Sequence, residues 1–264
     1  SASKYDPSHS SSNDEKGFRD ILIKWIDKNF GMSVEKLVTE YQTRKWPKVY
    51  IPTLRSLRQV SPEDLFKSRT IDDYFPPELK DAEIIAGNLD KYDAIILGIR
   101  AYNTVERLKF YQPKLFDYVE KGGTMIVQYN TTWRLKMDKE KIAPYKMNLS
   151  RDRVTVEEAE VRMLVPDHEV LNYPNKITAK DFDGWVQERG LYFANDWDKE
   201  KFTAILSAND PGEDPKDGGL LVAKHGKGHY IYSGYSWFRE LPAGVPGAYR
   251  LFTNMISIGK EPRP

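Results

Sequence analysis

Two short apolar runs with a helical segment between them dominate the middle of the chain. Residues 92–98 and 124–129 are each almost continuously apolar, as in strands buried on both faces of a sheet. Between them, apolar residues recur at helical spacing over 105–121, and two glycines at 122–123 end the predicted helix. The order strand, helix, strand predicts two parallel strands joined by a crossover helix.

Further strands are predicted on both sides of this unit. The pattern places them at 48–52, 82–86, 161–165, 202–207, 219–224 and 229–234. The last two are separated by His-Gly-Lys-Gly, which predicts a tight hairpin, and a final helix is predicted at 247–258. Strands that alternate with helices, followed by a late hairpin, predict a three-layer α/β domain.

The first 45 residues differ from the rest of the chain. Residues 1–16 are polar and Ser-rich, which is typical of a disordered tail or an expression remnant. Residues 17–45 carry two apolar stripes at helical spacing and are predicted to form a helical extension. The α/β domain itself is expected over 46–260.

Composition narrows the classes of function. The 264 residues include 40 Lys and Arg against 39 Asp and Glu, so a net charge of +1 indicates no surface for nucleic acid. No apolar run approaches the ~20 residues needed to cross a bilayer, and no membrane insertion is predicted. The absence of cysteine excludes disulfides, Cys-based zinc sites and a thiol nucleophile. No metal site and no cofactor are predicted, because metal-ligand and phosphate-binding glycine motifs are missing.

Polar and aromatic side chains follow both central strands. Arg100, Tyr102 and Asn103 follow the first strand, and Tyr129, Asn130, Thr131 and Trp133 follow the second. The carboxyl ends of parallel strands meet at one edge of a sheet, where ligands bind in open α/β folds. An arginine can hold a carboxylate or phosphate, and an aromatic ring can stack on a sugar. The pattern predicts a ligand pocket, with an Asn-capped turn and a buried structural arginine as the alternative.

A second set of candidates lies between 150 and 190. Arg151, Trp185, Gln187 and Arg189 are predicted to join the same binding surface. Arg151 belongs to an Arg-Asp-Arg triplet, and such charge runs more often form local ion pairs. Glu188 and His168 are the candidate catalytic residues, as acid or base. A carboxylate beside Arg189 is, however, more often part of an ion pair.

Several long motifs resemble one bacterial protein family. They are GIRAYNT (98–104), EKGGTMIVQYNT (120–131), SRDRVT (150–155), HEVLNYPNKIT (168–178), GWVQERGLYF (184–193) and LPAGVPGAYRLFTN (241–254). Together they resemble the C-terminal region of long PIG-L (LmbE-like) deacetylase proteins, common in Bacteroidetes. The resemblance implies a flavodoxin-like, class I glutamine amidotransferase-like fold. It also implies a periplasmic or extracellular location, while the sequence itself leaves a cytoplasmic one open. The AHPDD-type motif of the deacetylase domain does not occur in this chain.

The residues that an amidotransferase needs are missing as well. Such enzymes use a cysteine at a strand-to-helix elbow, where this chain reads Gln-Tyr-Asn-Thr at 128–131. They also use a late His–Glu pair, where residues 236–240 read Ser-Trp-Phe-Arg-Glu. We therefore expect a pseudoenzyme that binds a carbohydrate or a neighbouring deacetylase domain. Two alternatives stay open: a Cys-independent, sugar-active hydrolase or isomerase of trehalose-utilisation type, and a purely structural assembly module.

Overall fold

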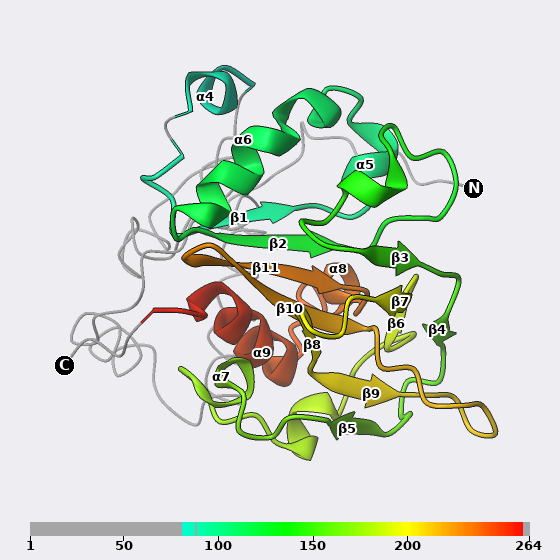
Figure 1. Cartoon of the computed structure of the whole chain (residues 1–264). Coiled ribbons are helices and arrows are strands. Elements are labelled where there is room, and N and C mark those ends of the chain that lie inside the picture. Colours follow the sequence, from blue (N-terminus) through cyan, green and yellow to red (C-terminus); the bar gives the residue numbers. More distant parts are fainter. Residues whose placement is uncertain (1–80, 88, 261–264) are drawn as a thin grey trace, which may run out of the picture. The chain divides into compact units, whose positions relative to one another are not determined.

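The centre of the fold is a five-stranded mixed sheet (Figure 1). The computed structural model describes residues 81–87 and 89–260. The strands of the sheet are β1 (Ala94–Leu97), β2 (Thr124–Gln128), β8 (Phe202–Ala204), β10 (Leu220–His225) and β11 (Gly228–Ser233). Their order is β1-β2-β11-β10-β8. The first three run parallel, whereas β10 is antiparallel to both of its neighbours.

Residues of the central strands alternate between two hydrophobic cores. Ile126 and Ile231 enter one core, and Met125 and Tyr230 enter the other. Helix α9 (Pro246–Ser257) covers the first core and helix α6 (Leu108–Glu120) the second, on opposite faces of the sheet (Figure 1). All four strand side chains are fully buried, which explains why the strand sequences are apolar without alternation. The prediction of a mixed α/β domain with parallel strands and helices is thus confirmed.

Shorter elements complete the described part of the chain. The other helices are α4 (Asp81–Ala86), α5 (Ala101–Thr104), η3 (Lys139–Lys141), α7 (Glu169–Asn172), η4 (Ala179–Phe182) and α8 (Trp237–Glu240). The other strands are β3 (Met147–Leu149), β4 (Arg153–Val154), β5 (Val161–Met163), β6 (Gly190–Leu191), β7 (Ala194–Trp197) and β9 (Leu206–Ala208). These strands form three antiparallel pairs, β3-β7, β4-β6 and β5-β9.

Most of the predicted elements that fall within this region are present, and two need correction. The strand predicted at 82–86 is helix α4, because a short apolar run suits either state and its packing against α6 decides between them. The strand predicted at 202–207 is divided between β8 and β9, which pair in different sheets. The predicted hairpin is confirmed, with Gly226 at φ 57° in the turn between β10 and β11. The predictions for 1–16, 17–45 and 48–52 lie outside the described residues.

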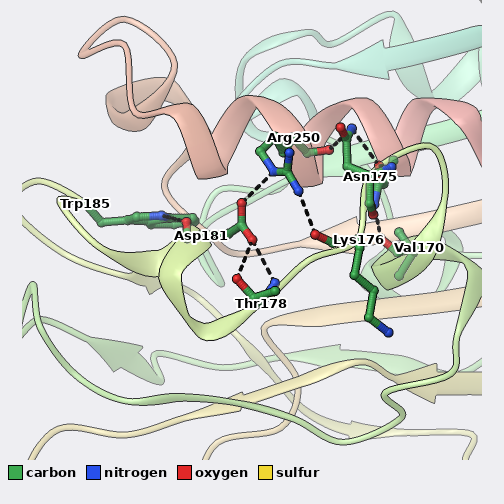
Figure 2. A network of polar contacts seen from close by, with 8 residues as sticks. Val170, Asn175, Lys176, Thr178, Asp181, Trp185 and Arg250 are labelled. Carbon is green, nitrogen blue, oxygen red and sulfur yellow. Dashed lines mark hydrogen bonds and ion pairs between the residues drawn. The ribbon is translucent and has the colours of Figure 1, made fainter. Parts of the chain in front are cut away.

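A polar network fastens α9 to the segment that contains α7 and η4 (Figure 2). The Nε atom of Arg250 donates to Asp181 Oδ1 at 2.7 Å, and the other carboxylate oxygen accepts from the backbone nitrogen of Thr178 at 2.7 Å. Asn254 is fully buried and donates to the carbonyls of Val170 and Asn175 at 2.9 and 2.7 Å. These bonds hold the irregular segment of α7 and η4 against α9, so the polar side chains in them have a structural role.

Candidate functional site

A cavity of about 430 Å³ lies where β1, β2 and β11 end. Four arginines line it, namely Arg100, Arg151, Arg153 and Arg239. Four aromatic residues line it as well, namely Tyr129, Trp133, Tyr192 and Phe238. Glu188 and Leu191 complete the lining. The site is therefore at the strand ends, where open α/β sheets bind ligands.

The first wall is built by the segments that follow β1 and β2. Their backbones are joined where the nitrogen of Arg100 donates to the carbonyl of Tyr129 at 2.8 Å. The Asn130 side-chain oxygen accepts from the nitrogen of Tyr102 at 2.8 Å. The Asn103 amide donates to the carbonyl of Trp133 at 2.9 Å. These amides hold the two strand ends together and set the positions of the residues that face the cavity.

Four of the predicted site residues therefore brace the wall without lining the cavity. They are Tyr102, Asn103, Asn130 and Thr131. Tyr102 is completely buried, and its hydroxyl donates to Gln112 Oε1 at 2.9 Å. Burial raises the pKa of this hydroxyl far above its usual value, so it stays protonated. Short polar side chains at strand ends readily bond to neighbouring backbone groups, which is the local alternative that the sequence left open.

The second wall is the short β4-β6 pair. Arg153 and Leu191 are opposite each other in this ladder, and both line the cavity. Gly190 lets the wall approach the chain that follows β11, since a Cβ there would lie 2.5 Å from the carbonyl oxygen of Gly234. The nitrogen of Leu191 donates to that same oxygen at 2.9 Å. A close backbone approach of this kind requires glycine.

The aromatic side chains form a continuous row along the cavity. Tyr129 and Tyr192 stack with ring centroids 5.7 Å apart and planes 15° from parallel. Trp133 meets Tyr192 edge-on at 5.5 Å, and the ring of Phe238 lies 5.3 Å from that of Tyr129. Trp133 is 44 % exposed, so part of its ring is accessible from solvent.

The charged side chains divide into two groups. Glu188 is nearly buried, and its oxygens lie 3.0 Å from Arg239 Nε and 3.5 Å from Arg153 Nη2. Arg100 and Arg151 form no ion pair within the described residues, and each places its guanidinium against a lining aromatic ring. Arg100 lies 5.8 Å from the centroid of Tyr129, and Arg151 lies 5.3 Å from that of Trp133.

Backbone strain is concentrated around the same cavity. In the part of the chain that the structure describes, the non-glycine residues with positive φ are Arg100 (56°), Arg134 (57°), Gln187 (67°) and Tyr192 (56°). Two of them line the cavity, Arg134 directly follows Trp133, and the Gln187 side chain bonds to Arg239. Conformations of this kind cost about 1–3 kcal/mol each and cluster at functional sites. Tyr192 is held in place by the hydroxyl of Tyr232, which donates to its carbonyl at 2.5 Å.

Four other predicted residues do not line the cavity, namely Trp185, Gln187, Arg189 and His168. The side chain of Gln187 bonds to Arg239. Trp185 is buried in the core, and its Nε1 donates to the carbonyl of Asp181 at 2.9 Å (Figure 2). Arg189 is buried as well and donates to the carbonyls of Ala159 and Phe182. His168 caps α7 by accepting from the nitrogen of Val170, and burial lowers the pKa of its imidazole. Trp185, Arg189 and His168 thus bond to backbone groups, whereas the sequence predicts ligand contacts for Trp185 and Arg189 and an acid or base role for His168.

Half of the residues that line the cavity are not among those predicted from the sequence. They are Arg153, Leu191, Tyr192, Phe238 and Arg239. Arg153 belongs to the charge triplet for which the sequence favours local ion pairs, whereas its carboxylate partner in the structure is Glu188, 35 residues further along the chain. Phe238 and Arg239 follow β11, so the rule that sites form at strand ends would have found them. Tyr192 carries no sequence signal, because its placement depends on the β4-β6 pairing.

No metal-binding group of His, Cys, Asp or Glu is found in the described part of the chain. No helix in this part of the chain is long and apolar enough to span a membrane.

Comparisons with known proteins found no matching family model and no matching curated protein. Several solved structures align with parts of this chain at low identity. A cytoplasmic protein from Salmonella typhimurium LT2 is 16% identical with a TM-score of 0.45, over 67% of this chain and 75% of that one. A protein described as ThuA-like from Bacteroides uniformis is 16% identical with a TM-score of 0.42, over 82% of this chain and 94% of that one. A β-galactosidase from Bacillus circulans is 12% identical with a TM-score of 0.38, over 63% of this chain but 22% of that one.

These matches give no support for the resemblance to PIG-L proteins. The function is therefore inferred from the cavity itself.

Proposed function

We propose that this domain binds a carbohydrate in the cavity at the ends of β1, β2 and β11. The observation that supports the proposal is the row of Tyr129, Tyr192 and Trp133 beside arginine side chains. A sugar ring has apolar C–H faces and a polar edge of hydroxyls. Aromatic rings pack against the former, and guanidinium groups donate to the latter. The flavodoxin-like, amidotransferase-like fold and the exported location remain expectations from the motifs, and the proposal does not depend on them.

The proposal is tested by calorimetric titration of the full chain with monosaccharides and short glycans. Trp133→Ala is expected to weaken binding about tenfold, because the variant loses the exposed ring at the end of the aromatic row. Phe110→Ala is the matched control, since Phe110 is 68 % exposed on α6 and does not line this cavity. The absence of saturable binding across the panel, or equal losses in both variants, would contradict the proposal.

A second candidate is a sugar-active hydrolase or isomerase of the trehalose-utilisation type that uses Glu188 as acid or base. It is favoured by the position of this carboxylate in the cavity lining. Binding without turnover is preferred here, because the oxygens of Glu188 already contact Arg153 and Arg239. His168, the other predicted acid or base, does not line the cavity.

Turnover assays on the same sugars distinguish the two candidates. If Glu188 acts as acid or base, Glu188→Gln is expected to lower kcat by about a hundredfold or more. A wild-type chain with measurable turnover whose Glu188→Gln variant keeps full activity would rule out this mechanism. A wild-type chain that binds sugars and turns none over would favour the binding proposal.

A further inference from the structure

The lining of the cavity has a net positive charge, whereas the chain as a whole is nearly neutral. Its lining contains four arginines and one glutamate, whereas the whole chain has 40 basic and 39 acidic residues. An arginine-rich lining of this kind attracts anions, because charge focused in a recess is poorly screened by solvent. The excess is local and coincides with the strained backbone and the aromatic row.

Only part of this charge is balanced within the protein. Glu188 contacts both Arg153 and Arg239, with one oxygen close to each guanidinium, and its single negative charge offsets one of their two positive charges. Arg100 and Arg151 have no carboxylate partner among the described residues, and their guanidinium groups lie against the rings of Tyr129 and Trp133, respectively. Their donors are therefore available to a ligand.

The two unpaired guanidiniums flank the part of the aromatic row formed by Tyr129, Tyr192 and Trp133. The contacts run from Arg100 to Tyr129, then to Tyr192, then to Trp133 and finally to Arg151. We infer that the ligand is an acidic sugar, whose ring packs along the aromatic row and whose carboxylate or phosphate is held by Arg100, Arg151 or both. This inference rests on the proposed carbohydrate-binding function and specifies its ligand class.

Both arginines are attached to backbone that is already ordered. Arg100 has φ 56°, and its nitrogen donates to the carbonyl of Tyr129. Arg151 follows Ser150, which is buried and whose hydroxyl donates to the carbonyl of Phe193 at 2.7 Å. A pre-ordered backbone lowers the entropy lost when the guanidinium binds an anion, and the fork of donors on arginine suits both carboxylate and phosphate.

The test is a calorimetric titration of the full chain at low ionic strength with matched neutral and acidic sugars. The probes are glucose and galactose, their uronates, their 6-phosphates, and inorganic phosphate alone. An acidic member is expected to bind about tenfold or more tightly than its neutral parent, since charge-assisted hydrogen bonds are among the strong ones. The double variant Arg100→Gln/Arg151→Gln is expected to remove that preference. Lys180→Gln, which removes one exposed positive charge from η4, is expected to keep it.

Each outcome has a distinct meaning. The uronate and 6-phosphate arms show which acid is recognised, and the single variants show which arginine holds it. Equal binding of acidic and neutral sugars, or an acid preference that survives in the double variant, would overturn this inference and leave the carbohydrate proposal intact. Binding of inorganic phosphate as tight as that of the sugar phosphates would support the anion site and overturn the carbohydrate function. Absence of binding by every probe would overturn both.

Discussion

Glu240 places a carboxylate in the protein interior next to the cavity residue Arg239. The side chain is fully buried, with one oxygen accepting from the nitrogen of Val186 at 2.9 Å. The other oxygen, Oε1, has no hydrogen-bond partner in the described part of the protein. Burial raises the pKa of Glu240 to about 7, against the opposing effects of the Val186 nitrogen and the charge of Arg189. The carboxyl group therefore titrates near neutral pH.

This pKa makes the stability of the domain depend on pH. The folded protein binds the Glu240 proton more tightly than the unfolded chain does. The stabilisation that this proton adds to the free energy of unfolding is therefore fully present below the unfolded pKa. It is lost as the pH rises through about 7. Glu240→Gln mimics the protonated form at every pH, whereas the wild type loses its proton as the pH rises. The free energy of unfolding of the variant minus that of the wild type is therefore expected to increase by about 2 kcal/mol from about pH 5 to about pH 8. Urea unfolding at the two pH values measures the difference, and a stability difference that does not change with pH would contradict the assignment.

At the scale of elements, the start of α9 lies against η4 more closely than any side chain would allow. A Cβ at Gly247 would stand 1.8 Å from the carbonyl oxygen of Asp181 and 2.4 Å from its Cα. The same aspartate holds Arg250, one turn further along α9. Helix α9 and η4 are thus joined at one place by a backbone contact and by the ion pair between Arg250 and Asp181. Both contacts require a residue without a side chain at position 247.

Gly247→Ala is expected to destabilise the protein by about 2–3 kcal/mol, because the added methyl group meets backbone that cannot rotate away. Gly98→Ala is the control, since a Cβ at Gly98 would meet no atom within 4 Å. That variant is expected to change stability by no more than about 0.5 kcal/mol. Thermal or denaturant unfolding of the two variants provides the comparison, and similar losses in both would show that the approach to η4 is not tight.

At the scale of the whole molecule, the cavity is assembled from five segments that are distant in sequence. Three of them follow β1, β2 and β11, which are neighbours in the sheet although about 100 residues separate the last two. The other two belong to the segments of β4 and β6, whose pairing places a second wall against the sheet. The order of strands thus brings the arginines and aromatic rings together, and no local motif contains the site.

The sequence by itself determined the layers of the fold and the edge of the sheet at which the site lies. Strands such as 124–128 must be apolar on both faces to be buried between two helices, and that requirement is visible in the residues themselves. The positions of Arg100 and Tyr129 after the first two strands follow from the same pattern.

Only the tertiary structure decided how the polar residues are used. Asn130 and Trp185 satisfy backbone groups, whereas Arg153 and Tyr192 face the cavity, and residue type does not distinguish the two uses. The short run at 82–86 is a helix that packs against α6, although so short an apolar run suits either a helix or a strand. Local hydrophobic patterns indicate how deeply a segment is buried. The hydrogen-bond partner of each polar group depends instead on contacts between segments far apart in the chain.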